Sequence, residues 1–250
     1  MCAAFSPEED SLFEKTGAAV LKRLRKTRNP ADLLAAVASA HKEFDRAFAT
    51  AAPEAKAAVA CRAGCDACCH VPVGVQAHEV LIAARHVQTH FSPTQLDELI
   101  ARTAAHRAAF AGRNNVERTA LKKPCALLVE GSCSIYAARP EACRSHHSHN
   151  AEACRTNLHH GNEALDVYIP GVRGRMFAVM LAIDQAVVEA GFDGQAYDFG
   201  SALHEALTSS LCAVRWVQRQ NAFPDACREA GDSYADGDSG VMHPEGYFQN

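Results

Sequence analysis

Apolar side chains recur at intervals of three and four residues along most of the chain, which is the spacing of amphipathic helices. The first such stretch has apolar positions at Leu12, Phe13, Thr16, Val20, Leu21 and Leu24. It begins with Ser6-Pro7-Glu8-Glu9, where a serine cap, a proline at the first helical position and a glutamate three residues after the cap occur together. A helix is therefore predicted to start at Pro7.

The same spacing predicts four more helices in the first half of the chain. One opens at Asn29-Pro30, with one face formed by Leu33, Leu34, Val37, Ala40, His41, Phe44 and Phe48. A short one is expected from Pro53 toward Cys61, and another from Ser92-Pro93 to about Phe110. The fourth is expected over 76–90, with an inward face of Val80, Leu81, Ala84 and Val87.

The helical pattern is absent where most cysteines lie. Residues 71–75 are predicted to be an extended link, and residues 126–136 a small hairpin that turns at Gly131-Ser132. Residues 139–161 are polar and rich in His and Cys, so they are expected to be irregular.

Helices return in the last third of the chain. Met176, Phe177, Met180, Ile183 and Val187 form one apolar face, and Gly191 is a plausible stop. A further helix is expected over 199–216, with an inward face of Leu203, Leu207, Leu211 and Val214. From Gly231 onward no apolar periodicity remains.

The predicted fold class is mainly α: helices packed around an irregular cysteine-rich metal-binding centre with a small β-hairpin. We expect a single helical domain over 1–225 with its cysteine cluster core at 61–160, and a loose C-terminal tail over 226–250. Loops without regular hydrogen bonding need another source of order, and a bound metal supplies it because its binding energy becomes folding energy.

Composition excludes several function classes. Hydrophobic residues make up 48% of the chain, which is typical of a globular protein, and the net charge of −4 gives no general attraction to nucleic acid or anionic membranes. No run of 18 uncharged apolar residues occurs, and Glu8, Glu9 and Asp10 lie where a secretory signal would be apolar. The expected location is cytoplasmic, where thiols stay reduced and clustered cysteines indicate metal binding or catalysis.

Eight of the eleven cysteines form two groups. The first is Cys61, Cys65, Cys68 and Cys69, and the second is Cys125, Cys133, Cys143 and Cys154. Four thiolates complete a tetrahedral zinc site or hold a four-iron cluster, and spacing alone does not separate these cases. Cys68 and Cys69 are adjacent, so their side chains should diverge unless the backbone kinks. The isolated Cys2, Cys212 and Cys227 suit a role as small buried hydrophobic residues.

The motifs around these cysteines resemble a known family. Gly64-Cys65-Asp66-Ala67-Cys68-Cys69-His70 followed by Pro72-Val73 and Glu79 looks like the opening of the CxxCxxCC family, the YkgJ-type cysteine cluster proteins described as zinc- or iron-chelating. Pro124-Cys125-Ala126-Leu127-Leu128 and Cys133-Ser134-Ile135-Tyr136 with Arg139-Pro140-Glu141-Ala142-Cys143-Arg144 look like its later motifs. The resemblance covers about residues 61–160.

This resemblance implies metal binding by Cys65, Cys68, Cys69, Cys125, Cys133 and Cys143, with Cys61 and Cys154 as further ligands. A relative of the family, the flagellin lysine N-methylase, carries a similar cluster that is thought to hold iron-sulfur, which favours an iron-sulfur cluster over Zn²⁺. This chain is much shorter and shows no glycine-rich loop for S-adenosylmethionine.

Other polar residues near the cysteines have both functional and structural interpretations. His70, His146, His147, His149, His159 and His160 could complete a metal shell or remain solvated. Arg139 and Arg144 could hydrogen-bond a cluster sulfur or an anionic substrate, or pair with a carboxylate or loop carbonyls. Pro140 is expected to fix a turn, Glu79 to favour a helix start, and the basic run at 22–28 to form a solvated helix end.

Three functional hypotheses follow. The first is a cytosolic metal-binding protein that holds an iron-sulfur cluster or zinc, with a role in redox chemistry or metal handling. The second is a protein-modifying enzyme related to iron-sulfur lysine N-methylases. The third is a structural zinc module that presents helices to a partner. The substrate or protein partner is not indicated by the sequence.

Overall fold

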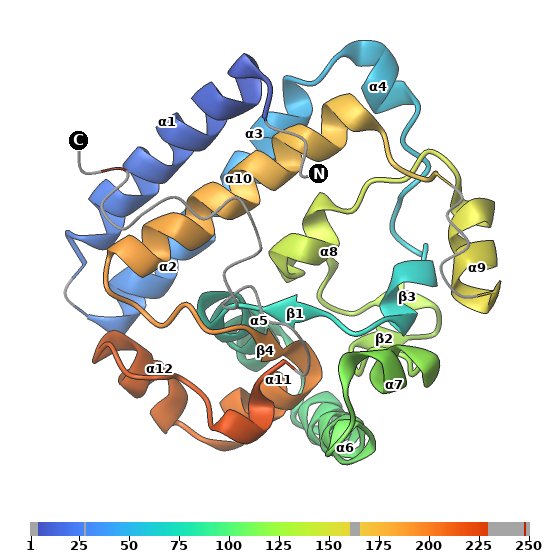
Figure 1. The fold of residues 1–250 in the computed structure, drawn as a ribbon. Helices are drawn as coiled ribbons and strands as arrows, with labels where there is room; N and C mark the ends of the chain where they lie inside the picture. The colour runs from blue at the N-terminus through green and yellow to red at the C-terminus, as the bar shows by residue number, and fades with distance from the viewer. Residues whose placement is uncertain (1–4, 28, 161–165, 230–247, 249–250) are drawn as a thin grey trace.

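The computed structural model describes residues 5–27, 29–160, 166–229 and 248. The fold is mainly α with two small antiparallel two-stranded sheets, as the apolar pattern predicts. Figure 1 shows α1 (Pro7–Leu24) and α10 (Pro170–Glu189) running side by side in one part of the molecule. The capping box predicted at Ser6 is present, because Glu9 N–H donates to Ser6 Oγ and Ser6 N–H donates to the Glu9 carboxylate.

The remaining helices surround α10 and the segments that carry the cysteines (Figure 1). Their bounds are α2 (Pro30–Ala40), α3 (Lys42–Ala49), α4 (Pro53–Ala57), α5 (Ala77–His90), α6 (Pro93–Phe110), α7 (Asn115–Ala120), α8 (Glu141–Ser145), α9 (Ala151–His160), α11 (Phe199–Thr208) and α12 (Leu211–Val217). Three 3₁₀ turns occur at η1 (Ala67–His70), η2 (Tyr136–Ala138) and η3 (Asp225–Cys227).

The described residues contain two short sheets, one a local hairpin and the other formed by distant segments. The predicted hairpin forms as β2 (Leu128–Val129) and β3 (Ser132–Cys133). Its turn lies at Glu130-Gly131, with φ values of 49° and 72°, and not at the predicted Gly131-Ser132. β1 (Gly74–Val75) lies in the predicted extended link and pairs antiparallel with β4 (Tyr197–Asp198), with Gly74 opposite Asp198. This second sheet fastens the segment after the first cysteines to the start of α11.

Three predictions about helices are corrected. The helix expected after Pro30 is interrupted at His41, which separates α2 from α3. A one-residue interruption leaves the apolar spacing almost unchanged, so Phe44 is still buried and periodicity does not reveal the break. Residues 139–161 are not irregular, because α8 and α9 lie within them. Both helices are short and mostly polar, so they lack the apolar stripe by which a helix is recognised in sequence.

The third correction concerns the helix expected over 199–216. The chain breaks at Ser209-Ser210 into α11 and α12, at hydroxyl side chains that compete for backbone hydrogen bonds. Leu211 and Val214, predicted to point inward, are 53% and 43% exposed. Cys212 and Trp216 form the buried face of α12 instead.

The core is continuous from α1 to η3 in the described residues. Cys212 and Cys227 are fully buried within it as free thiols, which confirms their interpretation as apolar core residues, whereas Cys2 lies outside the described residues. Residues 226–229 of the predicted tail are described, and of the rest of that tail only Phe248 is.

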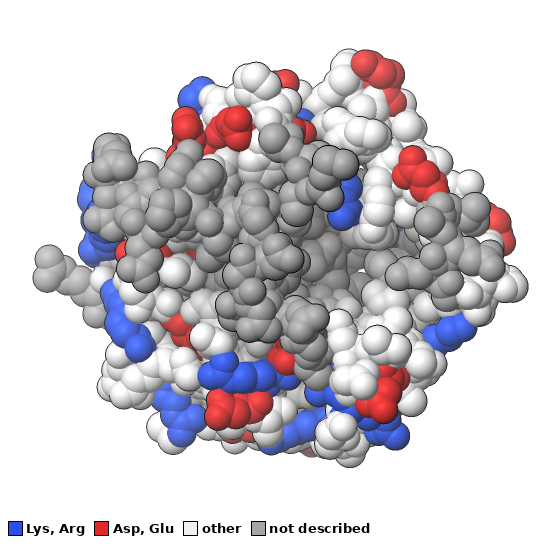
Figure 2. Space-filling model, viewed as in Figure 1, with Lys and Arg blue, Asp and Glu red and all other residues white. Residues whose placement is uncertain are grey.

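On the face drawn in Figure 2, Lys and Arg side chains are interspersed with Asp and Glu. None of the described helices combines the length and apolar character needed to cross a bilayer.

Candidate metal centre

Seven of the eight predicted cysteines line one cavity of about 90 Å³. They come from three separate stretches of chain and are Cys61, Cys65, Cys68, Cys69, Cys125, Cys133 and Cys143. None of the eight is in a disulfide bond, and each is partly exposed.

The first stretch bends sharply through a turn and the 3₁₀ segment η1. Gly64 has a φ of 86°, which side chains with a Cβ rarely adopt, and Cys65 N–H donates to the Arg62 carbonyl over 3.0 Å. Cys68 and Cys69 converge on the cavity, which is the outcome that the sequence allowed only with a kinked backbone. The 3₁₀ turn supplies the backbone kink that such convergence requires.

The second stretch is tied directly to the first. Cys125 N–H donates to the Cys69 carbonyl over 2.7 Å, and the β2–β3 hairpin then returns Cys133 to the same cavity. The backbone N–H groups of Leu127 and Ile135 donate to the sulfurs of Cys125 and Cys133, and these bonds favour the thiolate forms. Hydrogen bonds of this kind are among the means by which proteins tune metal–sulfur sites.

Cys143 and Cys154 come from the short helices α8 and α9. Cys143 lines the cavity, whereas Cys154 lies next to Cys61 at the edge of the cavity. Ser148 bridges the two, since its N–H donates to Cys61 Sγ over 3.1 Å and its Oγ accepts from Cys154 Sγ at 3.1 Å. Ala60 N–H donates to the Ser148 carbonyl over 2.8 Å, so the loop before α9 is fastened to the first cysteine segment.

Burial holds the thiols in their protonated form when no metal is bound. It raises the pKa of Cys61 and Cys133, raises that of Cys125 to about 11, and raises that of Cys143 well above its ordinary value. The pKa of Cys68 is raised mainly by its hydrogen bond with Cys69 and then by burial. Metal ligation by these residues therefore releases protons.

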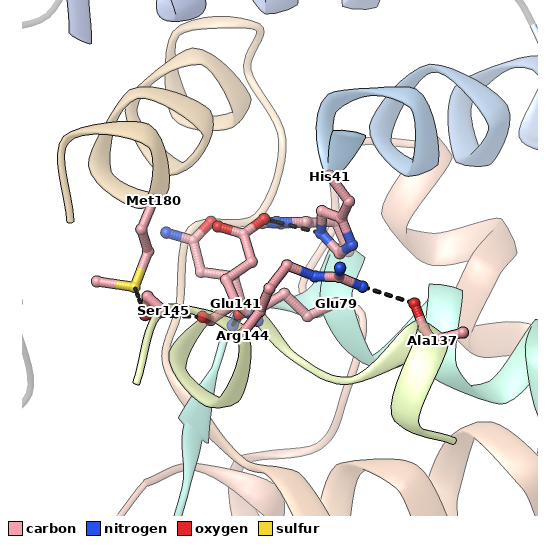
Figure 3. A network of polar contacts seen from close by, with 9 residues as sticks. His41, Glu79, Ala137, Glu141, Arg144, Ser145 and Met180 are labelled. Atoms are coloured by element: carbon pink, nitrogen blue, oxygen red, sulfur yellow. Dashed lines mark hydrogen bonds and ion pairs between the residues drawn. The ribbon is translucent and has the colours of Figure 1, made fainter. Parts of the chain in front are cut away.

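Arg139 opposes this effect from one wall of the cavity. Its positive charge lowers the pKa of Cys68 and Cys133, although burial outweighs it. The guanidinium lies over the Tyr136 ring at 3.9 Å, which fixes its position. Arg144 instead has a structural role, because its guanidinium donates to the Ala137 carbonyl over 2.6 Å (Figure 3). It also lies 3.6 Å from the Asp45 carboxylate.

Two of the candidate histidines line the cavity and the others do not. His146 and His147 are lining residues, and burial lowers the pKa of both, so each imidazole is neutral and able to act as a ligand. His70 contacts the Asp66 carbonyl at 3.1 Å and is not among the lining residues, and neither are His149, His159 and His160.

Sequence reasoning missed the apolar wall of the cavity. Leu127, Ile135 and Phe199 line it, and Phe199 N–H donates to the Val73 carbonyl over 3.0 Å at the edge of the β1–β4 sheet. Leu127 and Ile135 lie close to cysteines in the sequence, so the sequence could have indicated that they line the site. Phe199 is brought to the site only by the tertiary fold.

The comparisons with known proteins agree with the motifs. Residues 60–162 match the family model CxxCxxCC, described as a "putative zinc- or iron-chelating domain". No curated protein and no solved structure matches the chain. The matched range contains all eight cysteines of the two groups.

Proposed function

We propose that the cysteines of the cavity hold an iron-sulfur cluster whose role is redox chemistry or metal handling. The match of residues 60–162 to the CxxCxxCC family model supports metal binding there. The observation that carries the proposal is the convergence of seven cysteines on one cavity. Cys65, Cys68, Cys69, Cys125, Cys133 and Cys143 are the proposed ligands, with Cys61 and Cys154 as further ligands at the edge.

The donor set fits a thiophilic metal centre. Thiolates select zinc and iron-sulfur clusters over hard cations, and the N–H groups of Leu127 and Ile135 with the charge of Arg139 stabilise sulfur in its anionic form. The apolar wall of Leu127, Ile135 and Phe199 limits access of water to the sulfurs. An iron-sulfur cluster would supply one-electron transfer at this place.

The experiment is anaerobic purification followed by iron, zinc and sulfide analysis and a UV-visible spectrum. We expect stoichiometric iron and sulfide with broad visible absorption. The variant Cys68→Ser should lose most of both, and the matched control Cys212→Ser should keep them, because Cys212 is buried in the core away from the cavity.

Stoichiometric zinc without iron would contradict the cluster and support the structural zinc module. Absence of both metals would contradict metal binding altogether. A folded Cys68→Ser chain that retains all its iron would exclude Cys68 as a ligand.

A further inference from the structure

A second group of metal-ligating side chains lies outside the cysteine cavity. His41, His78 and Glu141 each offer a ligand atom, and these atoms all lie within 4.8 Å of one another. The Nε2 atoms of His41 and His78 are 2.9 and 3.1 Å from the same oxygen, Glu141 Oε1. The three side chains are 6%, 0% and 1% exposed. Figure 3 shows His41 directed toward Glu141.

The group is assembled from three elements that are far apart in sequence. His41 lies at the interruption between α2 and α3, His78 in the first turn of α5, and Glu141 at the start of α8. The break at His41 thus occurs where its side chain reaches the other two. The ligand set therefore comes from three separate parts of the chain and contains two different types of side chain.

Two further carboxyl groups, those of Glu79 and Asp184, interact with this group. Glu79 Oε2 accepts from the backbone N–H of Glu141 over 2.6 Å, and the charges of Glu79 and Glu141 act on Asp184. Arg144 lies in the same short helix as Glu141. Its guanidinium donates a hydrogen bond to the Ala137 carbonyl and forms an ion pair with Asp45. Across the described residues, no Lys or Arg forms an ion pair with Glu79, Glu141 or Asp184.

Several buried atoms here have no hydrogen-bond partner. They are Glu141 Oε2, His78 Nδ1 and Asp184 Oδ1. An unpaired carboxylate oxygen in a protein interior is costly, and such groups commonly mark an ion or water that completes the site. Carboxyl groups beside two histidines are donors that a divalent cation binds.

We propose that His41, His78 and Glu141 bind a divalent first-row transition ion, Fe²⁺ or Zn²⁺, at a site separate from the cysteine cavity. Two imidazole nitrogens with one carboxylate are a ligand set suited to these ions. The second Glu141 oxygen, Oε2, is available to complete the shell.

The two sites are chemically distinct yet adjacent. Helix α8 carries Glu141 in its first turn and Cys143 two residues later, so one short helix serves both. The proposed second site uses nitrogen and oxygen donors and does not depend on what the cysteines hold. Failure of this proposal can therefore be told apart from failure of the cysteine centre. The metal ligands would be nitrogen and oxygen at this site and sulfur at the other.

The test uses Co²⁺ as the probe on the metal-free full chain carrying His146→Gln and His147→Gln, so that no imidazole comes from the cysteine cavity. Bound Co²⁺ is measured by elemental analysis, thiolate ligation by charge-transfer absorption, and imidazole ligation by X-ray absorption. We expect imidazole scattering. We also expect His41→Gln or His78→Gln to remove one Co²⁺ equivalent while thiolate absorption is unchanged.

The matched control is His106→Gln. His106 is also buried and lies 3.3 Å from the carboxylate oxygen Asp198 Oδ1, but it is not part of a three-ligand group. It should keep the full Co²⁺ content. Absence of imidazole scattering would overturn the proposal, and this result does not require either histidine variant to fold. If the His41→Gln and His78→Gln chains do fold, an unchanged Co²⁺ content would also overturn it. In both cases the group would be a hydrogen-bond network only.

Discussion

Arg139 places a positive charge beside the thiols of Cys68 and Cys133 and is held there by the Tyr136 ring. A thiol binds metal only after it loses its proton, so a nearby cation that favours the thiolate makes metal uptake possible at lower pH. Arg144 lies close in sequence but is bonded to Ala137 and Asp45, and it does not line the cavity.

We predict that Arg139→Met shifts the pH at which metal uptake is half complete upward, by on the order of one pH unit. The variant should keep its full metal content at high pH. The measurement is metal bound after anaerobic reconstitution across a pH series, with Arg144→Met as control. Equal shifts in both variants would mean that Arg139 acts through the fold and not on the thiols.

Single residues also show what the sequence can reveal. All eight cysteines of the two groups were identifiable from their spacing, and seven line one cavity. The convergence of Cys68 and Cys69 could not be identified from spacing, because it depends on a 3₁₀ turn. The group of His41, His78 and Glu141 was missed because its members are up to 100 positions apart, and no local pattern records such a contact.

At the scale of elements, the turn between Cys61 and Cys65 illustrates how backbone geometry positions sulfur. Gly64 has a φ of 86°, yet nothing lies within 4 Å of where its Cβ would be. A side chain there meets no steric clash with neighbours, so the cost of substitution comes from the backbone alone.

Gly64→Ala is therefore predicted to lower the free energy of unfolding by about 1–2 kcal/mol while leaving the metal ligands in place. Thermal unfolding of the metal-loaded protein measures this. The control is Gly171→Ala, at an exposed position in α10 without a positive φ or a close neighbour, which should be neutral or stabilising. A neutral Gly64→Ala would show that the turn relaxes.

Elements with caps and apolar stripes were predictable, and those without were not. Proline and a capping residue identified the starts of α1, α2 and α6. Helices α8 and α9 were missed because they lie against the cysteine segments and carry few core residues. The split of α11 from α12 was missed because Ser209-Ser210 interrupts a pattern that otherwise continues.

At the scale of the whole molecule, burial of the thiols links stability to pH. Burial raises the pKa of Cys125 from 9.0 to about 11, so the folded metal-free protein keeps a proton that the unfolded chain loses near pH 9. The unfolded state then binds fewer protons, and the free energy of unfolding falls as pH rises. Below pH 9 both states are protonated and this contribution is fully present.

The metal-free protein is thus predicted to lose stability between about pH 9 and pH 11, and the metal-loaded protein to lose less, because its thiols are already deprotonated. Denaturant unfolding at a series of pH values measures both forms. Burial also raises the pKa of Tyr197, but this affects the two forms alike and cancels in their difference. If the free energy of unfolding changed with pH in the same way in both forms, the thiols would not exchange protons for metal.

The most direct test of the cysteine centre is differential alkylation of the full chain, read by mass spectrometry residue by residue. In the metal-loaded protein we predict protection of Cys61, Cys65, Cys68, Cys69, Cys125, Cys133, Cys143 and Cys154. Anaerobic chelation under reducing conditions should make these eight reactive, while Cys212 and Cys227 stay protected by the core. Equal labelling of the eight before and after chelation would contradict a shared metal centre.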